Sequence, residues 1–331
     1  MRRIKIIIIF IILFTTTSCI NYQELNDIGI INAIGIDYID NNYVLTLNML
    51  TPTEDNKKED VIYTTKRENL NDCFNEIYTI STKRSYLEHT NILILSNNIK
   101  KEQFNDIFNF FLKRIDSRNN FNVIILENYN ENIFKTNIDD INNLLKIARE
   151  ETSLIKEATL SDVIKNILEM NISYIPVLRN HSQMEIIGYK TIYEHEKLLS
   201  SSESIALNFI RDNVQKALIT LDDINYQINS SKTSIKIEEN KININISSNL
   251  SILNKSDNTE QILKIYKKEL KAIIQNFINN NALNYFKNLI YKHSYNYYKS
   301  HSNLKIEFFI NIETTITKNS NLLGDDPFDK E

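Results

Sequence analysis

The strongest constraint on the fold is a two-residue alternation of apolar and polar side chains that begins at Tyr226. The stretch YQINSSKTSIKIEENKININISSNLSI alternates throughout, with a turn at Glu239-Asn240. Such alternation is typical of strands that bury one face, so it predicts two long strands joined by a turn. Residues 258–280 then carry apolar side chains at helical spacing, residues 283–301 continue the helical pattern, and residues 303–316 alternate again as a final strand.

The region before residue 150 predicts a sheet with helices packed on it. Residues 27–37 and 43–50 form a hairpin around the turn IDNN, and residues 61–65 add a short strand. Further on, patterns of strand length alternate with apolar stripes at helical spacing. The predicted strands are 92–95 and 121–128, and the predicted helices are 70–81, 100–118 and 141–150.

A smaller module is expected between these two regions. It contains a helix at 161–170 capped by Ser161, an extended segment up to Pro176 and a strand pair bent at Gly188. A helix capped by Ser201 or Ser202 follows, and the sheet of this module is expected to continue through KALITL. The predicted division is 1–18 signal peptide, 19–172 N-terminal domain, 173–224 middle domain, 225–318 C-terminal domain and 319–331 polar tail.

The N-terminus, MRRIKIIIIFIILFTTTSC, has the order of a secretory signal peptide. Three basic residues precede an unbroken apolar run, and small polar residues follow it. The run is shorter than the roughly 20 apolar residues that a membrane-spanning helix needs. We therefore expect the rest of the chain to be a water-soluble body that is delivered across one membrane.

Cys19 stands where such a peptide would be cut. Bacterial lipoprotein processing requires a cysteine there, acylates its thiol and makes it the new N-terminus; two acyl chains are enough for stable anchoring. Thr17 and Ser18 suit this interpretation, whereas Thr16 occupies the position where leucine is usual. The alternative is an ordinary signal peptide with an incidental cysteine. The other cysteine, Cys73, lies beside an apolar helical stripe and is expected to be a buried thiol.

Composition and motifs argue against catalysis. The net charge is −4 and 24% of the residues are charged, without the basic patch that nucleic-acid binding needs. We expect no metal site and no cofactor, because the histidines do not share ligand spacing and the chain lacks a glycine-rich phosphate loop and a G-x-S-x-G elbow. Neighbouring carboxylates point apart on both helices and strands, so they form no catalytic pair.

His89 is the histidine of most interest, because it directly precedes a buried strand in YLEHTNILIL. It is either a histidine at the core edge, bonded to the backbone, or part of a contact between domains or subunits. The aromatic stretch YKHSYNYYKSH near residue 295 leaves a similar choice between packing and a partner surface.

The leader CINYQELNDIGIINAIGID resembles the start of the Ger(x)C family, the lipoprotein C subunits of bacterial spore germinant receptors. Ile20 and Gln23 depart from the tryptophan and arginine usual there. YLEH before ILIL, the stretch from Arg114 to Arg118, and IIGYKTIYEHEKLL resemble later family segments, and LNYFKNLIYK departs from a glycine-containing one. The leader residues shared with the family are Cys19, Tyr22, Glu24, Leu25, Asn26, Asp27, Ala33, Gly35 and Asp37.

The resemblance implies a receptor subunit and not an enzyme. It implies an α+β fold of three modules with mainly antiparallel sheets, lipid anchoring at Cys19, and assembly with A and B subunits at the outer, cortex-facing side of the spore inner membrane. The candidate partner surface is Tyr22, Glu24, Asn26, Asp27 and His89. Two alternatives are a substrate-binding lipoprotein of a transporter, which the antiparallel patterning disfavours, and an exported hydrolase, for which no convergent catalytic set is visible.

Overall fold

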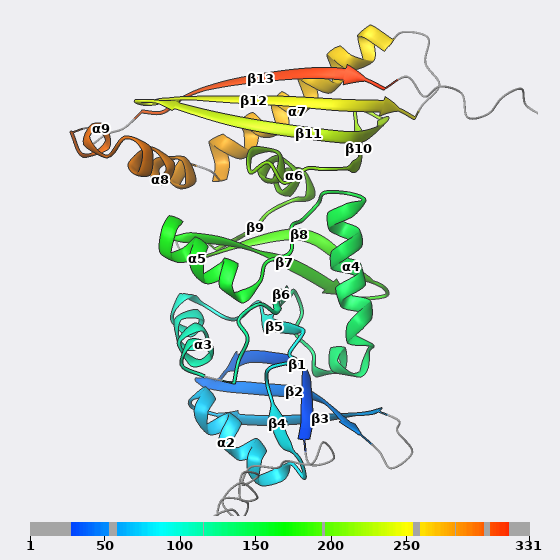
Figure 1. Cartoon of the computed structure of the whole chain (residues 1–331), viewed down its shortest axis with the longest axis vertical. Coiled ribbons are helices and arrows are strands. Elements are labelled where there is room, and N and C mark those ends of the chain that lie inside the picture. Colours follow the sequence, from blue (N-terminus) through cyan, green and yellow to red (C-terminus); the bar gives the residue numbers. More distant parts are fainter. Residues whose placement is uncertain are drawn as a thin grey trace, which may run out of the picture.

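The computed structural model describes residues 28–52, 58–114, 116–193, 196–253, 259–281, 283–300 and 305–317. Helices pack on two β-sheets, so the predicted α+β class is confirmed. The strands of the larger sheet follow one another along the long axis of the molecule. The smaller sheet lies at the end of this axis that is farthest from β2 and β3 (Figure 1).

The larger sheet runs in the order β3-β2-β1-β5-β6-β7-β8-β9, with β4 beside β1. Its outer pairs are antiparallel, but β1, β5, β6 and β7 run parallel to one another. Parallel neighbours need crossover connections, which helices between the strands supply. The strands are β1 Ile28–Ile39, β2 Asn42–Pro52, β3 Lys58–Arg67, β4 Arg84–Tyr86, β5 Ile92–Ser96, β6 Asn122–Leu126, β7 Ile172–Asn180, β8 Met184–Tyr193 and β9 Lys197–Leu198.

The central strands β5 and β6 of the larger sheet are buried on both faces. The side chains of Leu93 and Leu95 join a core with one set of helices, and those of Ile92 and Ile94 join a second core on the opposite face. This burial explains why β5 reads as a continuous apolar run instead of an alternating one. The first set is α2 Leu70–Ile80, α3 Lys101–Lys113 and α5 Leu160–Met170, and the opposite face carries η2 Glu131–Lys135 and α4 Ile138–Glu150.

The smaller sheet has the order β10-β11-β12-β13. The predicted hairpin is confirmed as β11 Ile224–Glu238 and β12 Lys241–Ile252, which pair antiparallel. β13 Glu307–Ile316 pairs parallel with β12, because a helical connection returns it in the same direction. The remaining elements are β10 Ala217–Leu221, α7 Thr259–Asn281, α8 Leu283–His293 and α9 Tyr295–Ser300.

The expected middle module divides between the two sheets. β7 continues the larger sheet through the pairs Ile125↔Val177 and Leu126↔Leu178, across the expected boundary after residue 172. KALITL does not continue that sheet; it forms β10, which pairs with β11 of the smaller one. Whether residues 173–224 fold as a separate unit stays a prediction.

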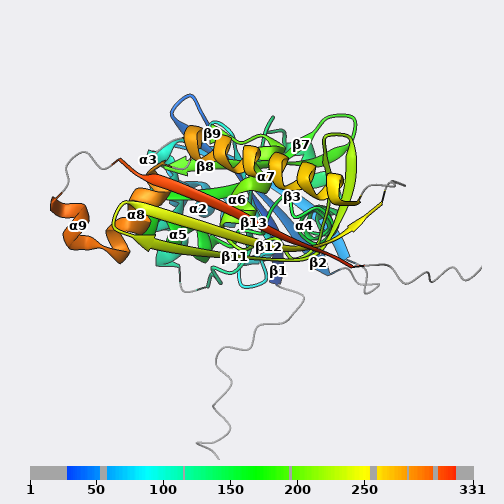
Figure 2. The same cartoon turned by 90° about the horizontal axis from the view of Figure 1, so that it is seen from above.

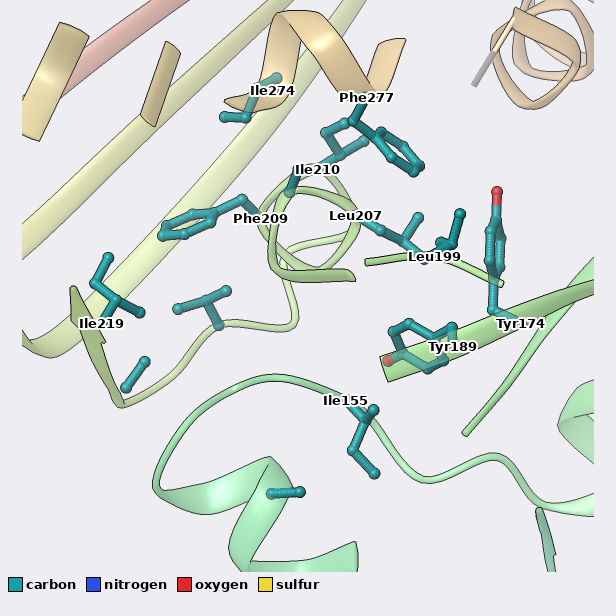
Figure 3. Close-up of a cluster of buried hydrophobic side chains, with 14 of the residues drawn as sticks. Ile155, Tyr174, Tyr189, Leu199, Leu207, Phe209, Ile210, Ile219, Ile274 and Phe277 are labelled. Carbon is teal, nitrogen blue, oxygen red and sulfur yellow. The ribbon is translucent and has the colours of Figure 1, made fainter. Parts of the chain in front are cut away.

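Helix α6 Ser201–Ile210 joins the two sheets. Leu207, Phe209 and Ile210 are buried, and they lie between Tyr189 on one side and Phe277 on the other (Figure 3). The view from above shows α6 beneath the smaller sheet and α7 (Figure 2). The exposed residues Ser201 and Ser202 lie in the first turn, and residues 204–210 are buried or half-buried on all sides, as expected for a helix packed between two layers.

Three local predictions are corrected. Thr159 caps α5 in place of Ser161, because Asp162 then completes a capping box. Ser200 caps α6 in the same way with Glu203. The segment around Gly188 is one strand with an irregularity in its pairing and not a strand pair.

Candidate functional site

Two residues of the leader motif have clear structural roles in β1. A Cβ on Gly35 would lie 2.3 Å from both Phe134 Cζ and Tyr129 Oη, so only glycine lets these rings cross the strand. The buried carboxylate of Asp37 accepts one hydrogen bond from the backbone N–H of Tyr38 at 2.8 Å and one from Asn98 Nδ2 at 3.3 Å. The motif therefore fixes how β1 packs and how its end is held.

Most of the predicted site residues lie outside the described residues. These are Cys19, Tyr22, Glu24, Asn26 and Asp27, and the described chain begins at Ile28, the first residue of β1. The other cysteine behaves as predicted: Cys73 is buried, its Sγ lies 3.5 Å from the carbonyl oxygen of Tyr43, and burial raises the pKa of its thiol.

His89 lies in the turn between β4 and β5. Its ring centroid is 5.7 Å from that of Tyr86, and the side chain is exposed to solvent. The position is at the surface and not at the edge of the core, which leaves the ring accessible to another molecule. A role for His89 in a subunit contact stays a prediction.

A polar depression of about 490 Å³ surrounds His89. It lies where β5 and β6 begin, and the solvent face of α4 forms one wall. Four separate segments contribute to it, so no single stretch of sequence reveals it. The lining residues are Glu88, His89, Thr90, Asn91, Arg118, Asn120, Phe121, Asn122, Asn142, Asn143, Lys146, Arg149 and Glu157.

The charges of this depression are largely paired. Arg118 contacts Glu88 with 3.4 Å between nitrogen and oxygen, and Arg149 contacts Glu157. Within the described part of the chain, Lys146 has no carboxylate within ion-pair distance. Exposed pairs contribute little to stability, about 0–1 kcal/mol each. The arrangement can therefore offer charged and amide groups to a partner without a large cost to folding.

The predicted segment from Arg114 to Arg118 divides into two roles. Arg114 donates two hydrogen bonds of 2.9 Å to Asp116 and lies over the rings of Phe74 and Phe110, at 4.7 and 5.3 Å from their centroids. The hydrogen bonds from Arg114 hold the pKa of Asp116 below its usual range. Arg114 thus fixes the loop after α3, and Arg118 reaches the depression beside His89.

Sequence reasoning missed a buried polar network between the two sheets. The hydroxyl of Tyr189 donates to Asn208 Oδ1 at 2.9 Å, and Asn208 Nδ2 donates to the carbonyl of Ser153 at 2.8 Å. Burial raises the pKa of Tyr189 to about 12, so its hydroxyl remains a donor at neutral pH. Gly188 was the one sequence signal of this packing, since glycine is required there: its φ is +136°, and a Cβ at this position would lie 2.5 Å from Ser204 Oγ.

Neither a metal-binding cluster nor a membrane-spanning helix is found among the described residues. Among them, no group of three or more histidine, cysteine or acidic side chains could hold a metal ion. None of the helices in the described ranges is long and apolar enough to cross a membrane. The residues that line the depression around His89 include no serine and no cysteine that could act as a nucleophile.

Comparison with known proteins gives three concordant results. Residues 21–180 match the spore germination protein N-terminal domain. Spore germination protein KC of Bacillus subtilis strain 168 is 27% identical over 173 residues, which cover 45% of this chain and 42% of that relative. The crystal structure of the GerBC protein superposes with a TM-score of 0.55 over 86% of this chain and 97% of that one, at 16% identity.

The chain belongs to the Ger(x)C family of spore germination proteins. The matched domain and the Bacillus subtilis relative are named for spore germination, and none of the three names refers to a reaction, in agreement with the prediction that the chain is not an enzyme. The likeness to GerBC shows that the two-sheet arrangement is shared at low sequence identity. β1, β5 and β6, together with the depression around His89, all lie inside the matched N-terminal domain.

Proposed function

We propose that this chain is the lipid-anchored C subunit of a nutrient germinant receptor, which assembles with membrane-embedded A and B subunits on the outer face of the spore inner membrane. The observation that supports the proposal most strongly is that two sequence features directly follow one another. A lipoprotein-type signal ends at Cys19, and the spore germination domain begins at residue 21.

The anchor sets how far the folded body can lie from the membrane. Nine peptide steps separate Cys19 from Ile28, and an extended chain covers at most about 3.6 Å per residue, which is about 30 Å in all. Two acyl chains hold a protein at a bilayer stably. A short tether raises the effective concentration of the body near integral subunits, so modest contacts suffice for assembly.

Two surfaces are proposed to make those contacts. The leader from Tyr22 to Asp27 lies next to the anchor in sequence, and the depression around His89 presents polar groups from four segments. Neither surface requires an active site, which fits a subunit that acts by binding.

The test replaces each cysteine in turn. Spores that express wild-type or Cys73→Ala chain should incorporate an alkyne fatty acid into it, and Cys19→Ala chain should not. Cys19→Ala spores should also germinate poorly on nutrients, measured as loss of optical density. An unlabelled wild-type chain would refute the anchor.

A further inference from the structure

β13, the last strand in the described part of the chain, leaves a long edge of the smaller sheet without a described partner strand. β13 stands at the end of the strand order and pairs with β12 over ten consecutive residues without a register shift. The ladder begins with the N–H of Glu307, which donates to the carbonyl of Asn240 at 2.9 Å, and ends with that of Thr317, which donates to Leu250 at 2.9 Å. Amides alternate in direction along a strand, so those of the even-numbered residues point away from β12.

The other sheet edges of the described chain are short, charged or occupied. Five of the ten residues of β3 are charged, and β9 has only two residues. The N–H of Leu218 in β10 already donates to the carbonyl of Glu151 at 2.8 Å. β13, with the sequence EFFINIETTI, has two acidic residues, no basic residue and no proline. Natural proteins protect free edges by the means seen in the other strands, and β13 lacks most of them.

The side chains along this edge leave apolar and acidic groups open. Phe308 and Ile306 are partly exposed where the core ends, and Phe309 on the opposite face is 51% exposed. Glu313 is exposed, and its register partner on β12 is Ser247, which cannot neutralise it. An additional strand would cover the apolar groups and could place a cation beside Glu313.

We propose that the free edge of β13 binds an extended strand of a partner protein, with apolar residues on the core face and lysine or arginine beside Glu313. This is strand addition, in which backbone hydrogen bonds supply affinity and alternate side chains supply specificity. A second copy of β13 brings only further carboxylates, so charge favours a basic partner. The edge lies at the opposite end of the molecule from β1, β2 and β3 (Figure 1).

The test measures peptide binding to the detergent-solubilised full chain. The probe is a dye-labelled decapeptide of alternating valine and lysine, and the control probe alternates valine and glutamate. Thr314→Pro removes one outward N–H and leaves the ladder to β12 intact, because proline is tolerated where the N–H faces solvent. Thr314→Val is the matched control, since it keeps that N–H.

The lysine probe should bind wild type and Thr314→Val equally, and Thr314→Pro at least tenfold more weakly. Glu313→Gln should weaken the lysine probe several-fold, and the glutamate probe should bind poorly throughout. Independently of any variant, bound peptide should slow hydrogen exchange at Ile310, Ile312 and Thr314. Equal binding by both Thr314 variants, protection elsewhere, or self-association of wild type that Thr314→Pro abolishes would overturn the proposal.

Discussion

Replacement of Gly35 by alanine should destabilise the protein strongly, although the change adds one methyl group. The new Cβ would lie 2.3 Å from Phe134 Cζ and 2.7 Å from its Cε2. Carbon atoms at contact prefer about 3.5–4.0 Å, so the ring must move by more than about 1 Å. Phe134 is 1% exposed and packed on all sides. Overpacking in such a core typically costs about 1–3 kcal/mol, and we expect a loss near the upper end.

Gly29 on the same strand provides the matched control. A Cβ there would lie 2.0 Å from Met49 Sδ and 2.7 Å from its Cγ, but both atoms belong to an unbranched, flexible side chain that can change rotamer. Gly29→Ala should therefore change the free energy of unfolding by less than about 1 kcal/mol, since alanine also lowers the entropy of the unfolded strand. Urea unfolding of both variants measures the difference as a shift in midpoint at unchanged slope.

A double-mutant cycle identifies the cause of the loss. Phe134→Leu should recover part of the stability of Gly35→Ala, with a coupling of at least about 1 kcal/mol, because the smaller side chain makes room for the methyl group. Equal unfolding free energies for Gly29→Ala and Gly35→Ala, or a coupling near zero, would refute the explanation that Gly35 is needed for this approach of rings to β1.

Three further predictions concern polar residues. Asp116→Asn should flatten the dependence of stability on pH. Arg114 lowers the pKa of Asp116, so the stability that this pair contributes is complete above the ordinary carboxyl pKa of about 4 and is lost as the pH falls through the lower pKa of the folded state. Urea unfolding midpoints of wild type and Asp116→Asn at about pH 6 and about pH 3 measure this difference. Asn208→Ala should cost about 2–3 kcal/mol in urea unfolding, because it leaves the carbonyl of Ser153 buried without its donor. Arg118→Ala should change the melting temperature little, since its ion pair is exposed, yet weaken capture of partner subunits; a large loss of stability would contradict the assignment of Arg118 to a contact surface.

The sequence predicted best those elements whose periodicity is local and long. The β11–β12 hairpin and α7 each extend over more than ten residues with one apolar face, so the period alone identifies them. Helix starts were displaced by one or two residues, at Thr159 and Ser200, because several serines and threonines compete for the cap and the third residue after it decides.

The arrangement of the sheets could not be predicted in the same way. The larger sheet crosses the expected boundary through two residue pairs, Ile125↔Val177 and Leu126↔Leu178, which lie about fifty residues apart in sequence. The depression around His89 needs four segments that only the fold brings together, so the sequence could single out His89 but not Lys146 or Arg149 beside it. Pairings between distant segments depend on tertiary contacts that no local pattern records.

The central claim is that this chain acts as a bound subunit beside integral membrane partners. Its most direct test is affinity purification of the full chain from detergent-solubilised inner membranes of dormant spores, followed by identification of the proteins recovered with it. The account predicts that receptor A and B subunits are recovered with wild-type chain and at reduced yield with Cys19→Ala. Recovery of the chain without either subunit, under conditions that keep A and B together, would contradict it.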